Sequence, residues 1–465
     1  MKYIDEIKIN SLLRVPVNEK EVVRILEKST QLKRLSLEES AKLLCVNDYA
    51  ILQKIYDAAF YVKNSIYGRR VVLFVPLYIS NICENSCLYC GFSSKNKTTI
   101  RKRLTFKEVL EQTKILLKRG HKRILMVAGE MAYSKESIGY YINAIKAIYS
   151  ASYKGNRIKR VNVNVAPMNV EDFGKLKEAG VGTYQIFQET YHEETYKKLH
   201  TSGAKSDFYN RLNAVDNAFK AGINDVGIGP LLGLYDHRFE ILALLMHIEY
   251  LEKTYGIGPH TISVPRIEPA PGSEYSLNPE HFISDEEFKK LVSVLRLSVP
   301  YTGIIMSTRE TANLRDVLIN LGVSQISAES KVTPGGYENN LKEAINNDEP
   351  GRQFSLSDQR SLNEIIISLL SKGFIPSFCA ACYRKNRIGK SFMNLAKSGE
   401  IKHMCDINAL ITFKEYLEDF ADPKIIKLGN SFIEEYKMKI LDEISLEVLD
   451  KFLLNVDAGV RDVYV

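Results

Sequence analysis

The 465-residue sequence contains no tryptophan, only seven cysteines and no long apolar run. Because no stretch approaches ~18 uninterrupted apolar residues, we expect no membrane-spanning helix, and the N-terminus lacks the apolar segment of a secretory signal. Basic residues outnumber acidic ones by only 63 to 56, and a net charge of +7 over this length does not predict nucleic-acid binding. Apolar residues at 45% and charged residues at 26% exclude a disordered chain and are typical of a globular protein.

The positions of the cysteines carry more information than their number. One cysteine, Cys45, stands alone in an apolar helical stretch and is predicted to pack in the core. The other six form two close groups: Cys83, Cys87 and Cys90, and Cys379, Cys382 and Cys405. An odd total in two triplets is a poor disulfide framework and a good ligand pattern. We therefore expect reduced thiols in the cytoplasm, in an anaerobic or low-oxygen cell if they hold iron and sulfur.

The periodicity of apolar residues changes twice along the chain. Residues 1–70 have only helical periodicity. From residue 71, apolar runs of strand length alternate with helical segments, several of which begin with a capping box such as Thr105/Glu108 or Ser284/Glu287. The eight runs predicted as strands are 71–79, 123–128, 160–166, 181–187, 223–228, 260–265, 302–307 and 323–328. Residues 331–350 are rich in Gly, Pro and Asn and are predicted as a long connection, after which the chain is mostly helical again.

Eight strands alternating with helices over roughly 260 residues are the content of a complete (β/α)₈ barrel. We therefore predict an α/β fold with a TIM barrel at residues 71–350. An N-terminal helical segment at 1–70 and a C-terminal helical domain at 351–465 flank it. An open, doubly wound sheet is the competing architecture. The barrel is favoured because the strand count reaches eight and polar residues follow most strands.

The first cysteine triplet follows the first predicted strand with the spacing C-x₃-C-x₂-C. Three thiolates on one loop can hold three irons of a [4Fe–4S] cluster and leave the fourth iron open for chemistry. A structural zinc site needs four ligands, and no fourth cysteine is near. The loop resembles the signature of the radical SAM (S-adenosylmethionine) superfamily, including the aromatic Tyr89 before the third cysteine. That resemblance implies a SAM-binding cluster held by Cys83, Cys87 and Cys90.

Further residues of the predicted barrel fit the same superfamily. Ala128-Gly129-Glu130, at the end of the second strand, is similar to the Gly-Gly-Glu motif whose backbone binds the SAM amino group, with Ala128 in place of the first glycine. Glu189 ends the fourth strand, and Arg211 comes one helix later. The resemblance implies that these two residues bind the ribose and the carboxylate of SAM. A surface ion pair is the alternative interpretation of Glu189 and Arg211.

The second cysteine triplet has the spacing C-x₂-C-x₂₂-C and again lacks a fourth cysteine. His403 or a distant residue could complete a Cys₃His zinc site, and an iron–sulfur site is the competing interpretation. Beside a radical SAM triplet, the second cluster is favoured. Two such triplets resemble the HydG branch of the HydG/ThiH family of radical SAM tyrosine lyases. Segments that carry the resemblance are 188–191, 260–266, 307–310 and 353–362, and it covers residues 15 to 460.

That resemblance implies a function and a set of partners. The enzyme would cleave the Cα–Cβ bond of L-tyrosine to p-cresol and dehydroglycine. Dehydroglycine would then yield carbon monoxide and cyanide at an auxiliary [4Fe–4S] cluster that carries a labile fifth iron and binds free cysteine. The product would serve the diiron subcluster of [FeFe]-hydrogenase. An electron donor such as ferredoxin or flavodoxin and the hydrogenase maturation proteins are the expected partners.

His260 is the candidate ligand of the fifth iron, because the resemblance implies a histidine in that role. It begins the sixth predicted strand, on the N-terminal rim of the barrel, whereas the first triplet lies on the C-terminal rim. Strands of ~7–8 residues separate the rims by roughly 25 Å. We therefore expect the C-terminal domain to cap the bottom of the barrel, with one cluster at each end. A satisfied rim histidine is the alternative, and His247 and His237 are weaker candidates.

Arginines are the candidate substrate residues, since an amino acid needs a cation for its carboxylate and arginine offers two parallel donors. Arg309, with Ser307 beside it, is the first choice, and Arg266 is the second. A salt bridge from either to Glu268 or Glu310 is the alternative. Two other functions compete with the lead: a ThiH-like tyrosine lyase (2-iminoacetate synthase) with a zinc-bound tail, and a non-catalytic iron–sulfur scaffold.

Overall fold

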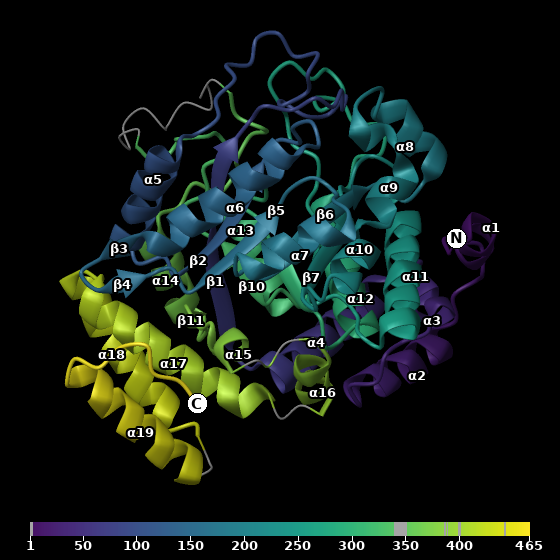
Figure 1. Cartoon of the computed structure of the whole chain (residues 1–465). Helices are drawn as coiled ribbons and strands as arrows, with labels where there is room; N and C mark the ends of the chain where they lie inside the picture. Colours follow the sequence, from purple (N-terminus) through teal and green to yellow (C-terminus); the bar gives the residue numbers. More distant parts are fainter. Residues whose placement is uncertain (1–2, 339–350, 386, 388, 399–400, 441–442) are drawn as a thin grey trace.

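The computed structural model describes residues 3–338, 351–385, 387, 389–398, 401–440 and 443–465. Its centre is a closed barrel of eight parallel strands, and this confirms the predicted fold (Figure 1). The strands pair in chain order, and the last one returns to the first, with Val72 to Phe74 opposite Gln325 to Ser327. They are β1 (Arg70–Ser80), β2 (Arg123–Ala128), β5 (Arg160–Asn164), β6 (Tyr184–Glu189), β7 (Val226–Pro230), β8 (Thr261–Ser263), β9 (Gly303–Met306) and β10 (Gln325–Ser327).

Helices surround the barrel because each one has an apolar face to bury against the strands. The capping boxes predicted at Thr105/Glu108 and Ser284/Glu287 are formed and begin α5 and α12. The helices between the strands are α5 (Phe106–Lys118), α6 (Lys135–Ser150), α7 (Val170–Glu178), α8 (Glu193–Leu199), η1 (Ala204–Ser206), α9 (Phe208–Leu212), α10 (Ala214–Lys220), α11 (His237–Tyr255), α12 (Asp285–Ser298) and α13 (Ala312–Asn320). A short hairpin that the periodicity did not predict, β3 (Ser152–Tyr153) with β4 (Asn156–Arg157), follows α6.

The N-terminal segment is helical, as predicted, and packs on one side of the barrel. It consists of α1 (Glu6–Leu12), α2 (Glu19–Thr30), α3 (Leu37–Leu44) and α4 (Tyr49–Tyr67). Cys45 follows α3, where its thiol lies 3.7 Å from the Leu13 carbonyl oxygen. The helix α4 packs against α12, and Tyr67 at its end donates a hydrogen bond to the Tyr301 carbonyl just before β9. This segment therefore continues the hydrophobic core of the barrel.

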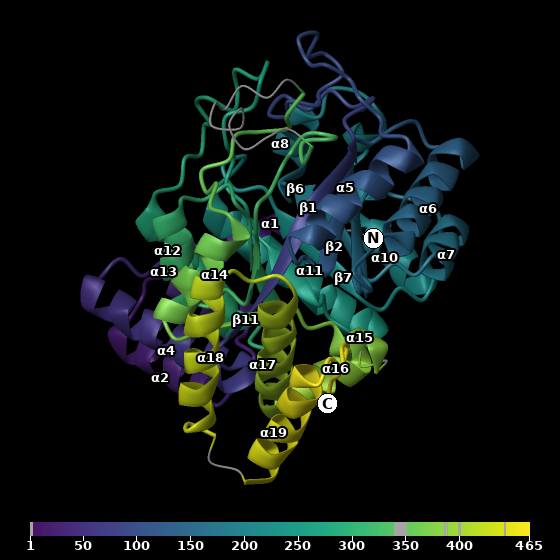
Figure 2. The ribbon, with the colours of Figure 1, turned by 90° about the vertical axis from the view of Figure 1, so that its left-hand side faces the viewer.

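The C-terminal extension lies at the end of the barrel opposite the long loops that follow β1 and β8 (Figures 1 and 2). Its elements are α14 (Leu362–Ser371), β11 (Ile375–Ser377), α15 (Ala381–Arg384), α16 (Lys390–Ser398), α17 (Ile401–Asp419), α18 (Pro423–Lys437) and α19 (Glu443–Asp457). The strand β11, which the sequence did not predict, pairs with the first residues of β1, Arg70 to Val72. The extension thus continues the sheet of the barrel. The division of the chain into three domains stays a prediction, and residues 339–350 of the connection predicted at 331–350 lie outside the described residues.

The interior of the barrel is lined by alternate residues of each strand, because side chains point to opposite faces in turn. Arg70 and Val72 of β1 line a cavity at the lower end, next to the C-terminal extension. Phe74, Pro76 and Tyr78 of the same strand line a larger cavity at the upper end. Since Val72 and Phe74 are about 6.6 Å apart along the strand, a thin layer of side chains separates the two cavities. No helix in the described part of the chain is long and apolar enough to cross a membrane.

Among the glycines in the barrel strands, Gly229 on β7 leaves the least room for a side chain. A Cβ atom there would lie 1.7 Å from the Ser263 carbonyl oxygen on β8. We predict that Gly229→Ala separates these strands and lowers the free energy of unfolding by about 3 kcal/mol, as overpacking does elsewhere. Gly139→Ala is the matched control, because a Cβ at this position in α6 meets nothing within 4 Å. It should stabilise the helix by about 1 kcal/mol. Thermal unfolding measures both; equal melting temperatures for the two variants would contradict the assignment.

Candidate active site

A cavity of about 1330 Å³, open to solvent at its mouth, lies at the C-terminal end of the barrel. Nearly all residues predicted for the first site line it, which places the ends of β1, β2, β6 and β9 around one space. They are Cys83, Cys87, Tyr89, Cys90, Ala128, Gly129, Glu130, Glu189, Arg211, Ser307 and Arg309. The upper ends of parallel strands meet at one rim of a barrel, where its enzymes carry their catalytic loops. The cavity is therefore the candidate active site.

The cysteine loop is held against the end of β2 by backbone hydrogen bonds. The Gly129 amide donates to the Ser80 carbonyl at 2.8 Å, and the Glu84 amide donates to the Glu130 carbonyl at 3.0 Å. A Cβ atom on Gly129 would lie 2.5 Å from the Ile82 carbonyl oxygen, so the close approach requires glycine. The middle position of the Ala-Gly-Glu tripeptide thus requires glycine for steric reasons. Ala128 is the last residue of β2, and its methyl group fits there.

Glu130 and Glu189 are joined by Arg211, whose guanidinium lies 2.7 Å from a Glu130 oxygen and 3.4 Å from a Glu189 oxygen. Lys205 binds Glu189 as a second cation. All four side chains are at most 15% exposed, so this is a buried network and the surface ion pair is ruled out. Burial would raise the pKa of Glu130, but Arg211 and Lys205 outweigh it and hold that pKa below its usual value. Both carboxylates are therefore charged at neutral pH.

The backbone of Glu189 has a positive φ of 71°, which is strained for a residue with a side chain. The following residues hold it in place: the Tyr191 amide donates to Glu240 Oε2 at 2.9 Å, and the Thr190 hydroxyl bonds to Glu240 Oε1. Glu240 is fully buried in α11, and burial raises its pKa to about 8. At neutral pH it is therefore mostly a neutral acid that fixes the turn carrying Glu189.

Tyr89 is buried, and its hydroxyl lies 2.8 Å from Nε2 of His200. The other ring nitrogen of His200 is 2.7 Å from the Tyr196 carbonyl, which can only accept, so Nδ1 carries the proton and Nε2 accepts from Tyr89. Burial lowers the pKa of His200 and keeps the ring neutral. The hydrogen bond to His200 thus fixes Tyr89, the aromatic residue between the second and third cysteines, which lines the cavity.

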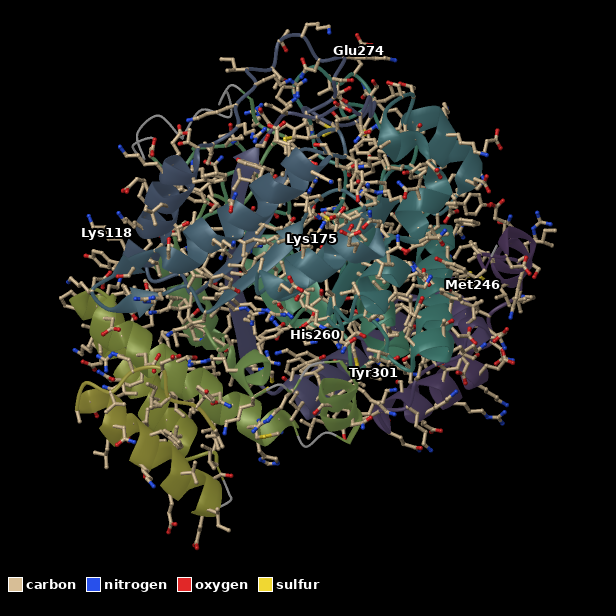
Figure 3. All side chains as sticks on the ribbon, viewed as in Figure 1. Lys118, Lys175, Met246, His260, Glu274 and Tyr301 are labelled. Atoms are coloured by element: carbon tan, nitrogen blue, oxygen red, sulfur yellow. The ribbon has the colours of Figure 1, made fainter. Side chains whose placement is uncertain are left out.

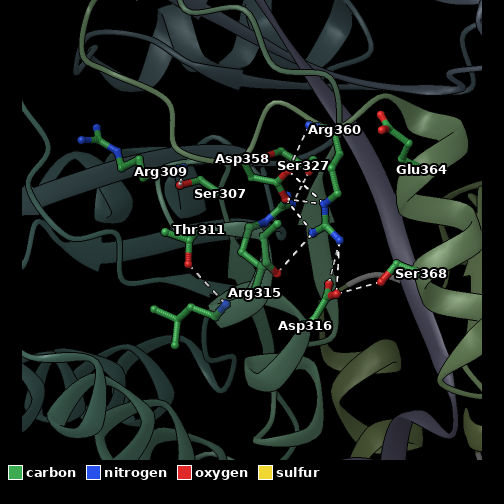
Figure 4. A network of polar contacts seen from close by, with 12 residues as sticks. Ser307, Arg309, Thr311, Arg315, Asp316, Ser327, Asp358, Arg360, Glu364 and Ser368 are labelled. Atoms are coloured by element: carbon green, nitrogen blue, oxygen red, sulfur yellow. Dashed lines mark hydrogen bonds and ion pairs between the residues drawn. The ribbon is translucent and has the colours of Figure 1, made fainter.

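Arg309 reaches the cavity without a carboxylate partner among the described residues. Its backbone amide donates to Ser307 Oγ at 3.3 Å, and its guanidinium lies 3.3 Å from the centre of the Phe354 ring. The guanidinium points away from the ion pairs that surround Arg315 (Figure 4). Burial lowers the pKa of Arg309, although it remains a cation at neutral pH. It is therefore available to a carboxylate that enters the cavity.

Arg266 is the predicted residue that does not join the others. It lies outside the upper cavity and forms ion pairs with Glu310 and with Asp285, the latter at 2.9 Å. The salt bridge considered as an alternative is the arrangement observed, because the side chains of a strand alternate and residue 266 points outward between the inward neighbours Pro265 and Ile267. A direct substrate role for Arg266 has no support in this geometry.

A second cavity of about 500 Å³ lies at the lower end of the barrel and gathers the second triplet. Cys379 follows β11, Cys382 lies in α15 and Cys405 lies in α17, and all three line it together with His260. Figure 3 places His260 in the lower half of the molecule, beside α15 and α16. Its Nε2 is 3.4 Å from the Tyr383 hydroxyl, whereas its Nδ1 lies 4.0 Å from Asp225 Oδ2 and has no hydrogen-bond partner among the described residues. His237 and His247 do not line this cavity.

Arginines face the lower thiols. Arg70 and Arg123 line the cavity from the starts of β1 and β2, and Arg123 donates to the Cys379 carbonyl at 3.0 Å. Burial raises the pKa of Cys382 to about 12, so these thiols stay protonated until cations bind them. His403 is exposed on α17, two residues from the buried Cys405 and on the other side of the helix. It therefore cannot complete a zinc site with that cysteine.

The comparisons with known proteins agree with this geometry. The Radical SAM superfamily model matches residues 77–246, and the Biotin and Thiamin Synthesis associated domain matches 263–375. The 2-iminoacetate synthase of Salmonella typhimurium is 30% identical over 78% of this chain and 92% of its own. A crystal structure of HydG, a maturase of the [FeFe]-hydrogenase, is 43% identical over the whole of both chains, with a TM-score of 0.94. HydG from Carboxydothermus hydrogenoformans is 42% identical over 96% of each chain, with a TM-score of 0.83.

The chain belongs to the radical SAM superfamily, in the family of HydG and 2-iminoacetate synthase. It is thus a radical SAM enzyme, and the family implies a [4Fe–4S] cluster and SAM. The upper cavity fits both groups: free thiols from one loop offer soft sulfur ligands, and charged side chains face the adjacent space. Among the described residues, no three His, Cys, Asp or Glu side chains are grouped to hold a single metal ion.

Several residues that line the cavity were not predicted from the sequence. Lys205 lies in a short 3₁₀ turn with no motif around it, and Gln353 and Phe354 come from the segment before α14, hundreds of residues from the cysteine loop. The only sequence signal for Gln353 and Phe354 was the similarity of residues 353–362 to the HydG/ThiH group. Long-range closure of the barrel, rather than local pattern, brings them to the site.

The buried acid Glu240 gives a testable pH dependence. Its pKa is raised from 4.5 to about 8, so its contribution to stability is greatest below pH 4.5 and is lost as the pH rises towards 8. Glu240→Gln keeps one donor and one acceptor and cannot ionise. Between pH 5 and pH 8 the free energy of unfolding of the parent should fall by on the order of 3 kcal/mol more than that of the variant. Denaturant unfolding at several pH values measures this; parallel pH profiles for the two proteins would contradict it.

Proposed function

We propose that this enzyme is a tyrosine lyase that cleaves the Cα–Cβ bond of L-tyrosine to p-cresol and dehydroglycine. We further propose that dehydroglycine yields carbon monoxide and cyanide at the lower site, for the diiron subcluster of [FeFe]-hydrogenase. The observation that supports this most is the presence of two thiol triplets at opposite ends of one barrel. The names of the relatives, 2-iminoacetate synthase and HydG, point the same way.

When bound, the upper cluster and SAM would supply a 5′-deoxyadenosyl radical that removes a hydrogen atom from the amino group of tyrosine. Cys83, Cys87 and Cys90 would hold the cluster. The backbone from Ala128 to Glu130 would bind the SAM amino group. Glu189 offers carboxylate oxygens to a ribose, and Lys205 and Arg211 offer donors to a carboxylate. The two carboxylates and two cations of this network balance in charge, and they offer partners of both signs to the amino and carboxylate groups of SAM, whose sulfonium adds a further positive charge.

The cavity offers a cation and aromatic side chains to a tyrosine substrate. Arg309 would bind the substrate carboxylate. Ser307 accepts a hydrogen bond from the Arg309 backbone amide and so fixes the loop that carries Arg309. Phe354 packs on the Arg309 guanidinium and limits its movement. Tyr78 and Phe92 line the same cavity and present apolar surface to a phenol ring. The enclosed walls would also keep water away from reactive intermediates.

Dehydroglycine would pass from the upper cavity to the lower one inside the barrel. Its decomposition balances in atoms, since HN=CH–COOH equals one carbon monoxide, one hydrogen cyanide and one water. Polar side chains lie along the path: Ser327 of β10 lines the upper cavity and Gln325, two residues earlier, lines the lower one. The thin layer between the cavities would then be the passage for a small polar molecule.

At the lower end, Cys379, Cys382 and Cys405 would hold the auxiliary [4Fe–4S] cluster, and His260 would bind the labile fifth iron. The imidazole of His260 and the side chains of Arg70 and Arg123 line this space. The arginines would stabilise the negative charge of bound thiolates and of a free cysteine. A ferredoxin- or flavodoxin-type donor and the hydrogenase maturation proteins are the proposed partners.

A ThiH-like lyase without the second step is the alternative function, because the 2-iminoacetate synthase match covers 78% of this chain. A non-catalytic iron–sulfur scaffold is the other. Enzyme chemistry is favoured over a scaffold by the buried charge network around Glu130 and Glu189, which a passive cluster carrier would not need.

The products of two cysteine variants separate these functions. With tyrosine, SAM and reductant under anaerobic conditions, the parent enzyme should release p-cresol, carbon monoxide and cyanide. Cys379→Ala should retain p-cresol and lose both gases by at least tenfold, whereas Cys83→Ala should lose all three products. EPR and iron counts check that each variant lacks one cluster and keeps the other. Release of p-cresol alone from the parent would contradict the second step and favour the ThiH-like function.

Arginine variants test the proposed substrate contact. We predict that Arg309→Lys raises the KM for tyrosine by about tenfold, because lysine cannot present two parallel donors to a carboxylate. Arg266→Lys is the matched control: it keeps the positive charge and its ion pairs lie outside the cavity, so the KM should stay within about twofold of the parent. Steady-state p-cresol formation gives both values. A larger effect at residue 266 than at 309 would exclude the proposed role of Arg309.

A further inference from the structure

Residues 351–361, here called the strap, contribute Gln353 and Phe354 to the wall of the upper cavity and form hydrogen bonds with three different loops. The Gly91 amide donates to the Gln353 carbonyl at 3.0 Å, directly beside the third cysteine of the first triplet. The Ser355 amide donates to the Pro269 carbonyl at 2.8 Å, and the Asp358 amide donates to the Thr308 carbonyl at 3.1 Å. A Cβ atom on Gly91 would lie 2.6 Å from the Arg352 carbonyl oxygen, so the cysteine loop and the strap are in direct backbone contact.

Buried ion pairs fix the far end of the strap (Figure 4). Asp358 binds Arg315 of α13, and both side chains are fully buried. Arg360 binds Asp358 at 2.7 Å and Asp316 at 3.1 Å. Removing one partner of such a network leaves an uncompensated buried charge, so the network specifies one position for the strap. The residues between Gly351 and Asp358 are therefore held at a defined distance from the cysteine loop.

Within the strap, Gln353 uses each of its hydrogen-bonding atoms. Its backbone amide donates to the Val332 carbonyl at 3.0 Å. Its side-chain oxygen accepts from the Tyr78 hydroxyl at 2.7 Å, and its Nε2 donates to the Sγ of Cys90 at 3.8 Å. A ligating thiolate can only accept, so the amide nitrogen must face the sulfur and the oxygen must face Tyr78. The orientation of the amide is thus fixed by chemistry as well as by position.

We propose that Gln353 is a positioning residue whose N–H donates to the Cys90 sulfur and raises the reduction potential of the cluster held by the first triplet. Hydrogen bonds to the sulfurs are one of the factors that set the potential of a cluster. An N–H dipole stabilises the reduced, more negative cluster more than the oxidised one. Tyr78 holds the amide from its other side, which keeps the N–H directed at the sulfur. The proposal rests on the proposed cluster at this triplet and is independent of the substrate.

The test is an EPR-monitored redox titration of the full chain with both clusters reconstituted. Gln353→Met keeps the length of the side chain and removes the donor. We expect the signal of the upper cluster, identified by its loss in Cys83→Ala, to shift to a more negative potential. A tenfold fall in the reduced-to-oxidised ratio at fixed potential corresponds to about 59 mV for one electron. The signal of the lower cluster should not move, because its ligands are at the other end of the barrel.

Ser357→Ala is the matched control, since its side chain is exposed on the same strap and touches neither cysteine loop nor cavity. It should leave both potentials unchanged. If Gln353→Met assembles its upper cluster with unchanged potential, the proposal is wrong, whatever happens to tyrosine cleavage. If Gln353→Met loses iron, Tyr78→Phe decides instead: it retains Gln353 and releases only the amide oxygen. A smaller negative shift in Tyr78→Phe supports the proposal, and no shift overturns it.

Discussion

The pairing of β1 with its neighbours at both of its ends is the constraint on which the two sites depend. The strand has 11 residues, and its first residues bind β10 and β11 while its last ones bind β2. Its inward side chains line the lower cavity at Arg70 and the upper cavity at Tyr78. The first cysteine loop begins at the end of β1, and Cys379 follows β11, the strand that pairs with the start of β1. One rigid element therefore sets the distance and direction between two chemical sites.

Charge compensation explains why such polar groups can be buried at all. In the upper cavity, the two carboxylates and two cations of the network around Glu130 and Glu189 balance each other, and Arg309 is a further cation. In the lower cavity, Arg70 and Arg123 face three thiols, whose pKa values are raised by burial. The upper site can therefore offer both signs of charge to the amino and carboxylate groups of an amino acid, whereas the lower one has cations that would balance the negative charge of thiolates and of their bound partners.

The sequence predicted those features that depend on local chemistry. Eight apolar runs predicted eight strands, and cysteine spacing with the Ala128–Glu130 tripeptide located the upper site. His260 was placed on the lower rim by its position at the start of a strand, and the structure confirms that it shares a cavity with the second triplet. Arg266 was predicted to join the upper cavity, but strand alternation turns it outward. Lys205, Gln353 and β11 could not be predicted, because contacts between residues far apart in the chain position them.

The path of the chain after β10 shows why the C-terminal extension cannot be considered apart from the barrel. The strap at 351–361 binds the loops of the upper rim, α14 leads away from it, and β11 then pairs with β1 at the lower rim. A single connection thus contacts both ends of the barrel before the lower thiols are reached. The helix α14, of 10 residues, joins the strap to β11 and is anchored in the core by the buried side chains of Ile365, Ile366 and Leu369. The residues that enclose the upper site and those that form the lower one are therefore joined by one hydrogen-bonded and packed connection.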